Sequence, residues 1–221
     1  MKVLLVDDQP LFREGIAFLL GNALPVIEIL QAGSAEQAMQ RIGERDDLDL
    51  ALVDWNLPDA SGGELIARLR SRCSRLTIVA LSSRDDAVTI LAALEAGAMG
   101  FIAKQASAAA VADAIRHVIA KGIYLPTGFI SNFGDALPVD RREPATRTSP
   151  CALGLTRRQT AVLYRVLQGK ALATIAQELS ISGGSVRSSM TTALRALNAT
   201  TRTQAIVAAA RLGLAFDRAC A

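Results

Sequence analysis

The chain contains few cysteines, few aromatic residues and no long apolar run. Its three cysteines, Cys73, Cys151 and Cys220, lie far apart and lack CxxC spacing. A disulfide framework and a cysteine-ligated zinc site are therefore not expected, which favours a reducing, cytoplasmic location. No uncharged apolar run reaches about 18 residues, and the N-terminal segment turns acidic at Asp7, too early for a signal peptide. We expect neither a membrane span nor secretion.

Charge is distributed unevenly along the 221 residues. Residues 1–122 hold 12 Lys and Arg against 16 Asp and Glu, whereas residues 151–221 hold 9 against 2. The length suits two domains, and a hydrophobic content of 51% gives both enough apolar residues for a core. The basic C-terminal part indicates an anionic partner for that part alone, although a basic surface facing water would give the same count.

Short β-forming runs alternate with helical patterns in residues 1–122. The expected strands are Val3–Val6, Val26–Leu30, Leu50–Val53, Thr77–Leu81 and Met99–Ile102. Helices are expected between them, with Ser34 and Ser61 as N-caps and Gly21 as the end of the first helix. This alternation predicts an α/β domain with a doubly wound, flavodoxin-like, five-stranded parallel sheet.

The rest of the chain differs in character. Residues 123–150 are rich in Gly, Pro and polar residues and contain four prolines, which predicts a linker. Residues 151–221 show no strand signal and predict an all-α unit of four helices. Its first helix has a capping box at Thr156 and a stop at Gly169, and a turn at residues 182–185 precedes the third helix.

Chemically distinctive residues follow four of the five expected strands. Asp7 and Asp8 end the first strand, Asp54 ends the third, Ser82 follows the fourth and Lys104 follows the fifth. Carboxyl ends of parallel strands share one edge of a sheet. Each pair of carboxylates 4 Å apart would repel by about 4 kcal/mol at an effective dielectric constant of 20. A divalent cation removes that cost, and all-oxygen ligands favour Mg²⁺. The plainer alternative is that loop carboxylates point to water.

Residues 1–122 resemble the receiver domain of two-component response regulators. The resemblance is carried by Val6–Pro10, Leu52–Pro58, Ala80–Ser83 and Gly97–Lys104. It implies that the Asp54 carboxylate accepts a phosphoryl group from the phosphohistidine of a sensor histidine kinase. It also implies that Mg²⁺ is bound directly by Asp8 and Asp54, through water by Asp7, and by the backbone carbonyl of Asn56.

The same resemblance implies a switch behind the acceptor. Lys104 would neutralise the phosphoryl charge together with the metal, and the Ser82 hydroxyl would donate to a phosphoryl oxygen. The loop after Ser82 would then move, and Phe101 would reorient behind it. Ordinary core packing is an equally simple account of Phe101.

Residues 155–214 resemble the helix-turn-helix output domain of the NarL/FixJ (LuxR-type) regulators. The resemblance is carried by Leu155–Leu163, Gly169, Ile175–Ser182, Ser185–Arg187 and Leu194–Leu197. It implies that the helix at residues 185–197 enters the major groove of double-stranded DNA. The outward residues Arg187, Ser188 and Thr191 would contact bases or phosphates. Those better placed for phosphates are Arg195, Thr156, Arg157 and Arg158.

Together these resemblances imply a phosphorylation-switched, DNA-binding transcription regulator that is not an enzyme. A homodimer is expected on phosphorylation, through the last helix at residues 202–212, where Ala205, Ala208 and Ala209 allow close approach; alternatively that helix covers its own core. A second hypothesis is a signalling protein whose helical unit binds protein instead. The unusual residues Leu172, Ala173, Gly183 and Gly184 favour it. A dehalogenase-like phosphatase is not favoured, because no second aspartate follows two residues after Asp54.

Overall fold

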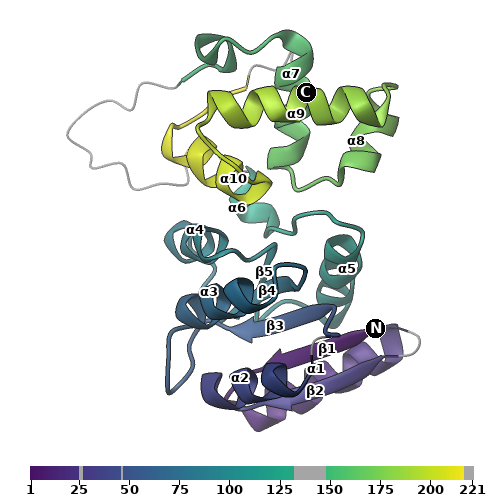
Figure 1. The fold of residues 1–221 in the computed structure, drawn as a ribbon, viewed down its shortest axis with the longest axis vertical. Helices are drawn as coiled ribbons and strands as arrows, with labels where there is room; N and C mark the ends of the chain where they lie inside the picture. The colour runs from purple at the N-terminus through teal and green to yellow at the C-terminus, as the bar shows by residue number, and fades with distance from the viewer. Residues whose placement is uncertain (25–26, 46, 132–147, 217–221) are drawn as a thin grey trace, which may run out of the picture. The chain divides into compact units, whose positions relative to one another are not determined.

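A computed structural model describes residues 1–24, 27–45, 47–131 and 148–216, in two compact units. The first unit comprises residues 1–85 and 92–119, and the second comprises residues 86–91 together with the chain from residue 120 onward. Each unit is described separately below (Figure 1). None of the described helices is long and apolar enough to cross a membrane.

The first unit is a doubly wound α/β domain, as the sequence predicts. Five parallel strands pair in the order β2-β1-β3-β4-β5. The strands are β1 (Lys2–Val6), β2 (Glu28–Ala32), β3 (Leu50–Asp54), β4 (Thr77–Ser82) and β5 (Gly100–Ala103). The helices are α1 (Pro10–Ala23), α2 (Ala35–Glu44), α3 (Gly62–Arg72), α4 (Ala87–Ala96) and α5 (Ala108–Ile119), although residues 87–91 of α4 are grouped with the second unit. Helix α1 packs against α5 and α2 packs against α3, so helices cover both faces of the sheet (Figure 1).

The central strands form the core because nearly all their residues are apolar. Every residue of β3 and of β4 is buried, as expected for strands covered on both faces. Strand β2 lies at the edge, is only partly buried and begins at Glu28; its predicted start, Val26, lies outside the described residues. Pairing with β1 sets the register of β2, with Glu28 opposite Lys2.

Helix starts follow the predicted caps more closely than helix ends. Ser61 and Glu64 form a reciprocal capping box at the start of α3, and the Ser34 hydroxyl caps α2 by accepting the Gln37 N–H. The expected stop at Gly21 is wrong, because α1 continues through it to Ala23 and ends in extended backbone at Leu24.

The loop after β3 approaches the start of α3 very closely. The Gly62 N–H donates to the Trp55 carbonyl at 2.9 Å, and Asn56 pairs with Ser61 across the same loop. A Cβ atom on Gly62 would lie 2.5 Å from the Asp54 carbonyl oxygen and 2.6 Å from Trp55 Cα. Only glycine permits this approach, which fixes the backbone that carries the Asp54 side chain.

The second unit contains the four predicted helices and some chain before them. Its elements are α6 (Thr127–Ser131), a 3₁₀ turn η1 (Pro150–Leu153), α7 (Arg157–Leu167), α8 (Leu172–Glu178), α9 (Gly183–Ala196) and α10 (Arg202–Arg211). Helix α9 packs against α7 and α8, and its buried stripe includes Val186 and Met190. Helix α9 begins at Gly183, two residues before the predicted start, with Ser182 as its N-cap.

Gly169 ends α7 in left-handed backbone, as predicted, and allows a further close approach. Its carbonyl accepts the Ile123 N–H at 2.7 Å, and a Cβ atom there would lie 1.8 Å from the Ile123 carbonyl oxygen. Residues 120–131 therefore group with the helical unit, and residues 127–131 are helical. The role of residues 123–150 as a linker stays a prediction, and its positions 132–147 lie outside the described residues.

We predict that Gly62→Ala lowers the free energy of unfolding of the first unit by about 1–3 kcal/mol, because the new methyl group meets backbone atoms that cannot rotate away. Urea unfolding followed by fluorescence measures this, since Trp55 is the only tryptophan. Gly15→Ala is the control, because its Cβ meets nothing within 4 Å and alanine favours the helix. Equal stability of the two variants would contradict the close approach.

Candidate functional site

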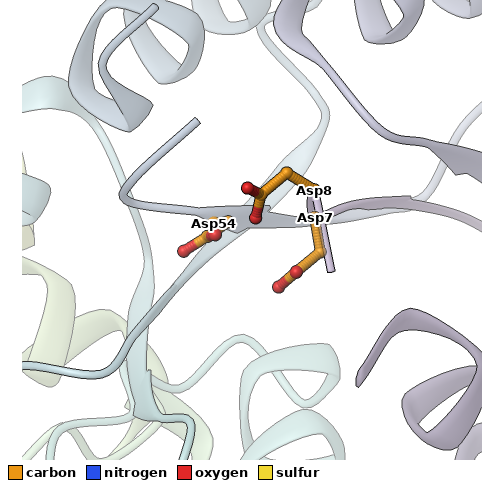
Figure 2. A group of neighbouring side chains, drawn as sticks. All are labelled: Asp7, Asp8 and Asp54. Atoms are coloured by element: carbon orange, nitrogen blue, oxygen red, sulfur yellow. The ribbon is translucent and has the colours of Figure 1, made fainter. Parts of the chain in front are cut away.

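Three carboxylates meet at the C-terminal edge of the sheet. Asp7 and Asp8 directly follow β1, and Asp54 is the last residue of β3, the neighbouring strand. One carboxylate oxygen from each lies within 4.8 Å of the others. Figure 2 shows the three side chains as neighbours. Asp7 and Asp54 are buried, whereas Asp8 is exposed. The cluster is therefore open to solvent on the Asp8 side.

Lys104 provides the positive charge that faces this cluster. Its Nζ atom lies 2.7 Å from Asp7 Oδ2 and 2.9 Å from Asp54 Oδ2, and it donates a hydrogen bond to Asp54. The Lys104 side chain is only 8% exposed. The ammonium group also lies over the Phe12 ring, 4.8 Å from its centroid, in a cation–π contact. One cation thus bridges two buried carboxylates and is held by an aromatic face.

Burial and the neighbouring hydrogen bonds shift the pKa of Asp54 in opposite directions. Burial raises the pKa of the Asp54 carboxyl, although hydrogen bonds from Lys104 and from the Asn56 N–H pull it down. The nearby charge of Asp7 raises the Asp54 pKa further. Burial alone would lower the pKa of Lys104, but its contacts with Asp54 and Asp7 outweigh that effect and raise the pKa. Lys104 is therefore firmly cationic.

The donor set fits a hard divalent cation. Among the described residues, Asp7 Oδ2 is a buried oxygen without a hydrogen bond, although Lys104 lies beside it. Asp8 adds an exposed carboxylate, and all candidate ligand atoms are oxygens. Oxygen ligands with two or three negative charges suit Mg²⁺. Asn56, whose backbone carbonyl was predicted as a ligand, lies two residues after Asp54 and is exposed.

The two predicted switch residues lie in neighbouring strands, β4 and β5. Ser82 is the last residue of β4 and is fully buried, and its Oγ atom accepts the Arg84 N–H at 3.0 Å. The hydroxyl proton is thus available to another acceptor. Phe101, in β5, is fully buried. This burial fits either predicted role of Phe101, switch residue or core residue.

The second unit carries a basic, outward-facing surface on α9. Arg187, Ser188, Thr191 and Arg195 are all exposed, as predicted. Within the described part of the chain, neither Arg187 nor Arg195 forms an ion pair. By contrast, Arg165 and Lys170 of this unit share one carboxylate, because both pair with Glu178.

The other predicted phosphate contacts cluster at the start of α7. Thr156 caps this helix through a capping box with Gln159, while Arg157 and Arg158 are exposed in its first turn. The Thr156 Oγ1 atom accepts the Gln159 N–H, so its hydroxyl proton is still available to a phosphate oxygen. The helix start itself presents backbone N–H groups to an anion.

Comparison with known families shows which families the two parts of the chain match. Residues 3–116 match the family of response regulator receiver domains, and residues 153–209 match the bacterial regulatory proteins of the luxR family. The chain is a response regulator. It consists of a receiver domain followed by a LuxR-type DNA-binding domain.

Relatives match nearly the whole length of this response regulator. The glycerol metabolism activator of Pseudomonas putida is 33% identical over 94% of each chain. The DNA-binding transcriptional activator DevR/DosR of Mycobacterium tuberculosis is 32% identical over 96% of this chain and 95% of its own. A LuxR-family response regulator structure from Aurantimonas sp. SI85-9A1 is 25% identical, with a TM-score of 0.56, over 64% of this chain and 98% of that chain.

The fold is also that of RcsB from Salmonella typhimurium, which has a TM-score of 0.57 at 18% identity over 91% of this chain and 93% of that chain. This likeness concerns the fold alone.

The roles of two further residues of the pocket were not predicted from the sequence of this response regulator. Phe12 belongs to the apolar stripe of α1, yet its ring contacts the Lys104 ammonium. Arg13 donates to the Asp7 carbonyl at 2.6 Å and to Gln31 Oε1 at 3.0 Å, which ties the end of β1 to β2. The only available signal was their position in the first turn of the helix that follows Asp7 and Asp8.

We predict that Lys104→Met lowers the free energy of unfolding of the metal-free receiver domain by about 3 kcal/mol, because it leaves two buried carboxylates without a counter-charge. Urea unfolding in the presence of a chelator, followed by Trp55 fluorescence, measures the change.

Arg116→Met serves as the control for this measurement. Arg116 pairs only with exposed Asp113, so its loss should cost no more than about 0.5 kcal/mol. The double variant Lys104→Met, Asp7→Asn should recover part of the lost stability. If Lys104→Met were no less stable than Arg116→Met, the bridging role of Lys104 would be wrong.

Proposed function

We propose that this response regulator is switched by phosphorylation of Asp54 by a partner sensor histidine kinase. One observation carries the proposal: the Asp54 carboxylate lies beside the Lys104 ammonium and two further carboxylates in a pocket that opens at Asp8. The relatives named above are activators, which favours activation of transcription. A cytoplasmic location stays a prediction from the cysteine content. We propose no activity on a small-molecule substrate.

Asp54 is suited to act as the nucleophile in this transfer. An oxygen of its carboxylate attacks phosphorus, the P–N bond of the donor phosphohistidine breaks, and the imidazole leaves with its proton. The Asn56 N–H holds Asp54 Oδ1 at 3.2 Å, and Lys104 holds Oδ2, so the carboxylate has a fixed orientation. Lys104 then stabilises the charge that accumulates on the phosphoryl oxygens.

The neighbouring residues would hold Mg²⁺ and sense the new group. Oxygens of Asp7, Asp8 and Asp54, with the Asn56 carbonyl, are the proposed ligands. When bound, Mg²⁺ supplies positive charge against the transferred phosphoryl group. Ser82 retains a hydroxyl proton to donate to a phosphoryl oxygen, and we propose that this pull moves the loop after β4 and reorients Phe101.

The helical unit provides the output by binding double-stranded DNA through α9. Its match to a DNA-binding family and the unpaired Arg187 and Arg195 favour DNA over a protein partner. We propose that phosphorylation promotes a homodimer. Of the three alanines predicted at the dimer contact, Ala205 and Ala209 are buried, so a dimer would use the more accessible Ala208 and the exposed Leu212.

We predict that the wild-type chain gains the mass of one phosphoryl group when incubated with acetyl phosphate and Mg²⁺, and that Asp54→Asn gains none. The amide cannot form the acyl phosphate, although it has nearly the same shape as the carboxylate. Intact-mass spectrometry measures the product. Asp113→Asn, on the exposed surface of α5, should be modified like the wild type. Modification of Asp54→Asn to the wild-type extent would disprove the acceptor assignment.

We predict that DNA binding by the phosphorylated chain weakens steeply as salt concentration rises, because each neutralised phosphate releases counterions. Arg195→Ala should weaken binding for every sequence and reduce the slope of log K against log salt by about one. Arg72→Ala, an exposed site in the receiver domain, is the control and should leave the slope unchanged. Fluorescence anisotropy measures the affinity and its salt dependence. Salt-independent binding would contradict the assignment of the basic surface of α9 to DNA binding.

A further inference from the structure

The outward face of α9 carries two adjacent threonines, Thr191 and Thr192. Both side chains are exposed, whereas Val186, Met190 and Ala193 pack inward. The threonines therefore belong to the surface that would meet DNA. Only Thr191 was expected there from the sequence, as one of several polar contacts.

Both threonine hydroxyls are turned back onto the helix. Thr191 Oγ1 donates to the Arg187 carbonyl at 3.0 Å, and Thr192 Oγ1 donates to the Ser188 carbonyl at 3.3 Å. Each hydroxyl thus donates its only proton to a backbone carbonyl one turn earlier in the helix. The other branch at Cβ is a methyl group, which points away from that carbonyl. The two side chains consequently offer methyl groups rather than hydrogen-bond donors.

The rest of the exposed face lacks the side chains that best recognise adenine or cytosine. The exposed residues of α9 are Gly183, Gly184, Arg187, Ser188, Thr191, Thr192 and Arg195. The side chains that best pair with adenine, Asn and Gln, and those that accept from cytosine, Asp and Glu, do not occur anywhere in residues 183–196. The arginines can read guanine or bind phosphates. The methyl groups of Thr191 and Thr192 are the other distinctive groups on this face, and they can make apolar contacts.

The apolar feature of the major groove is the 5-methyl group of thymine. We propose that Thr191 and Thr192 are specificity-determining residues that select thymine through contact between their γ-methyl groups and this 5-methyl group. The proposal rests on the proposed function of α9 as the DNA-reading helix. It predicts sites with thymine at the positions under these two residues, independently of the phosphate contacts that set overall affinity.

The test begins with selection of random duplex DNA by the phosphorylated full-length chain. Each thymine of the enriched site is then replaced singly by deoxyuridine, which removes only the 5-methyl group. We expect binding to weaken about fourfold at one or two positions, the effect of losing one buried methyl-sized group. Substitutions elsewhere in the site should change binding little.

Paired variants separate the methyl group from the hydroxyl. Thr191→Val and Thr192→Val keep a methyl group and remove the hydroxyl, so they should keep the deoxyuridine penalty. Thr191→Ser and Thr192→Ser keep the hydroxyl and lose the methyl group, so they should bind the thymine and deoxyuridine duplexes equally. Thr200→Ser, exposed but outside α9, is the control and should behave like the wild type.

The outcomes distinguish this inference from the proposed function. If specific binding occurs but no deoxyuridine substitution weakens it, or if the serine variants keep the penalty, the methyl-contact proposal is wrong while DNA binding stands. If the valine variants lose the sequence preference instead, the hydroxyls do the reading and the proposal is also wrong. If no sequence is enriched at all, the proposed function of α9 fails and this inference fails with it.

Discussion

The structure of the receiver domain is organised around the repulsion between carboxylates that share one edge of a parallel sheet. Asp7 and Asp54 are both buried at the ends of neighbouring strands, where water screens their charges poorly. Lys104 balances part of this charge by contacting both. The remaining negative charge, with Asp8 at the open side, is the basis of the proposed binding of a cation and, through it, of an anionic phosphoryl group.

The surrounding backbone is arranged to hold these charges in place. Gly62 allows the start of α3 to lie against the peptide that follows Asp54, and Arg13 fixes the end of β1 through the Asp7 carbonyl. Ser82 ends the adjacent strand, so a change at Asp54 has a short route to the loop after β4. In the proposed function, Asp54 is the fixed acceptor and the loop after β4 is the segment that moves.

Much of this arrangement could be predicted from the sequence because its signals are local. Apolar runs specified the buried strands, and Ser61 and Thr156 specified helix starts through side chains that reach only three residues along the chain. The end of α1 could not be predicted, because the helix continues through Gly21 despite the local preference of glycine for a helix end. The contact between Phe12 and Lys104 joins residues far apart in sequence, so no local sequence pattern indicates it.

Electron paramagnetic resonance of Mn²⁺, which shares the preference of Mg²⁺ for oxygen ligands, tests most directly whether the carboxylate cluster is a cation site. We expect one bound Mn²⁺ per full-length chain, displaced by Mg²⁺, and loss of that binding when Asp8 and Asp54 are both changed to asparagine. Failure of the wild-type chain to bind Mn²⁺, or equal binding by the double variant, would contradict this expectation.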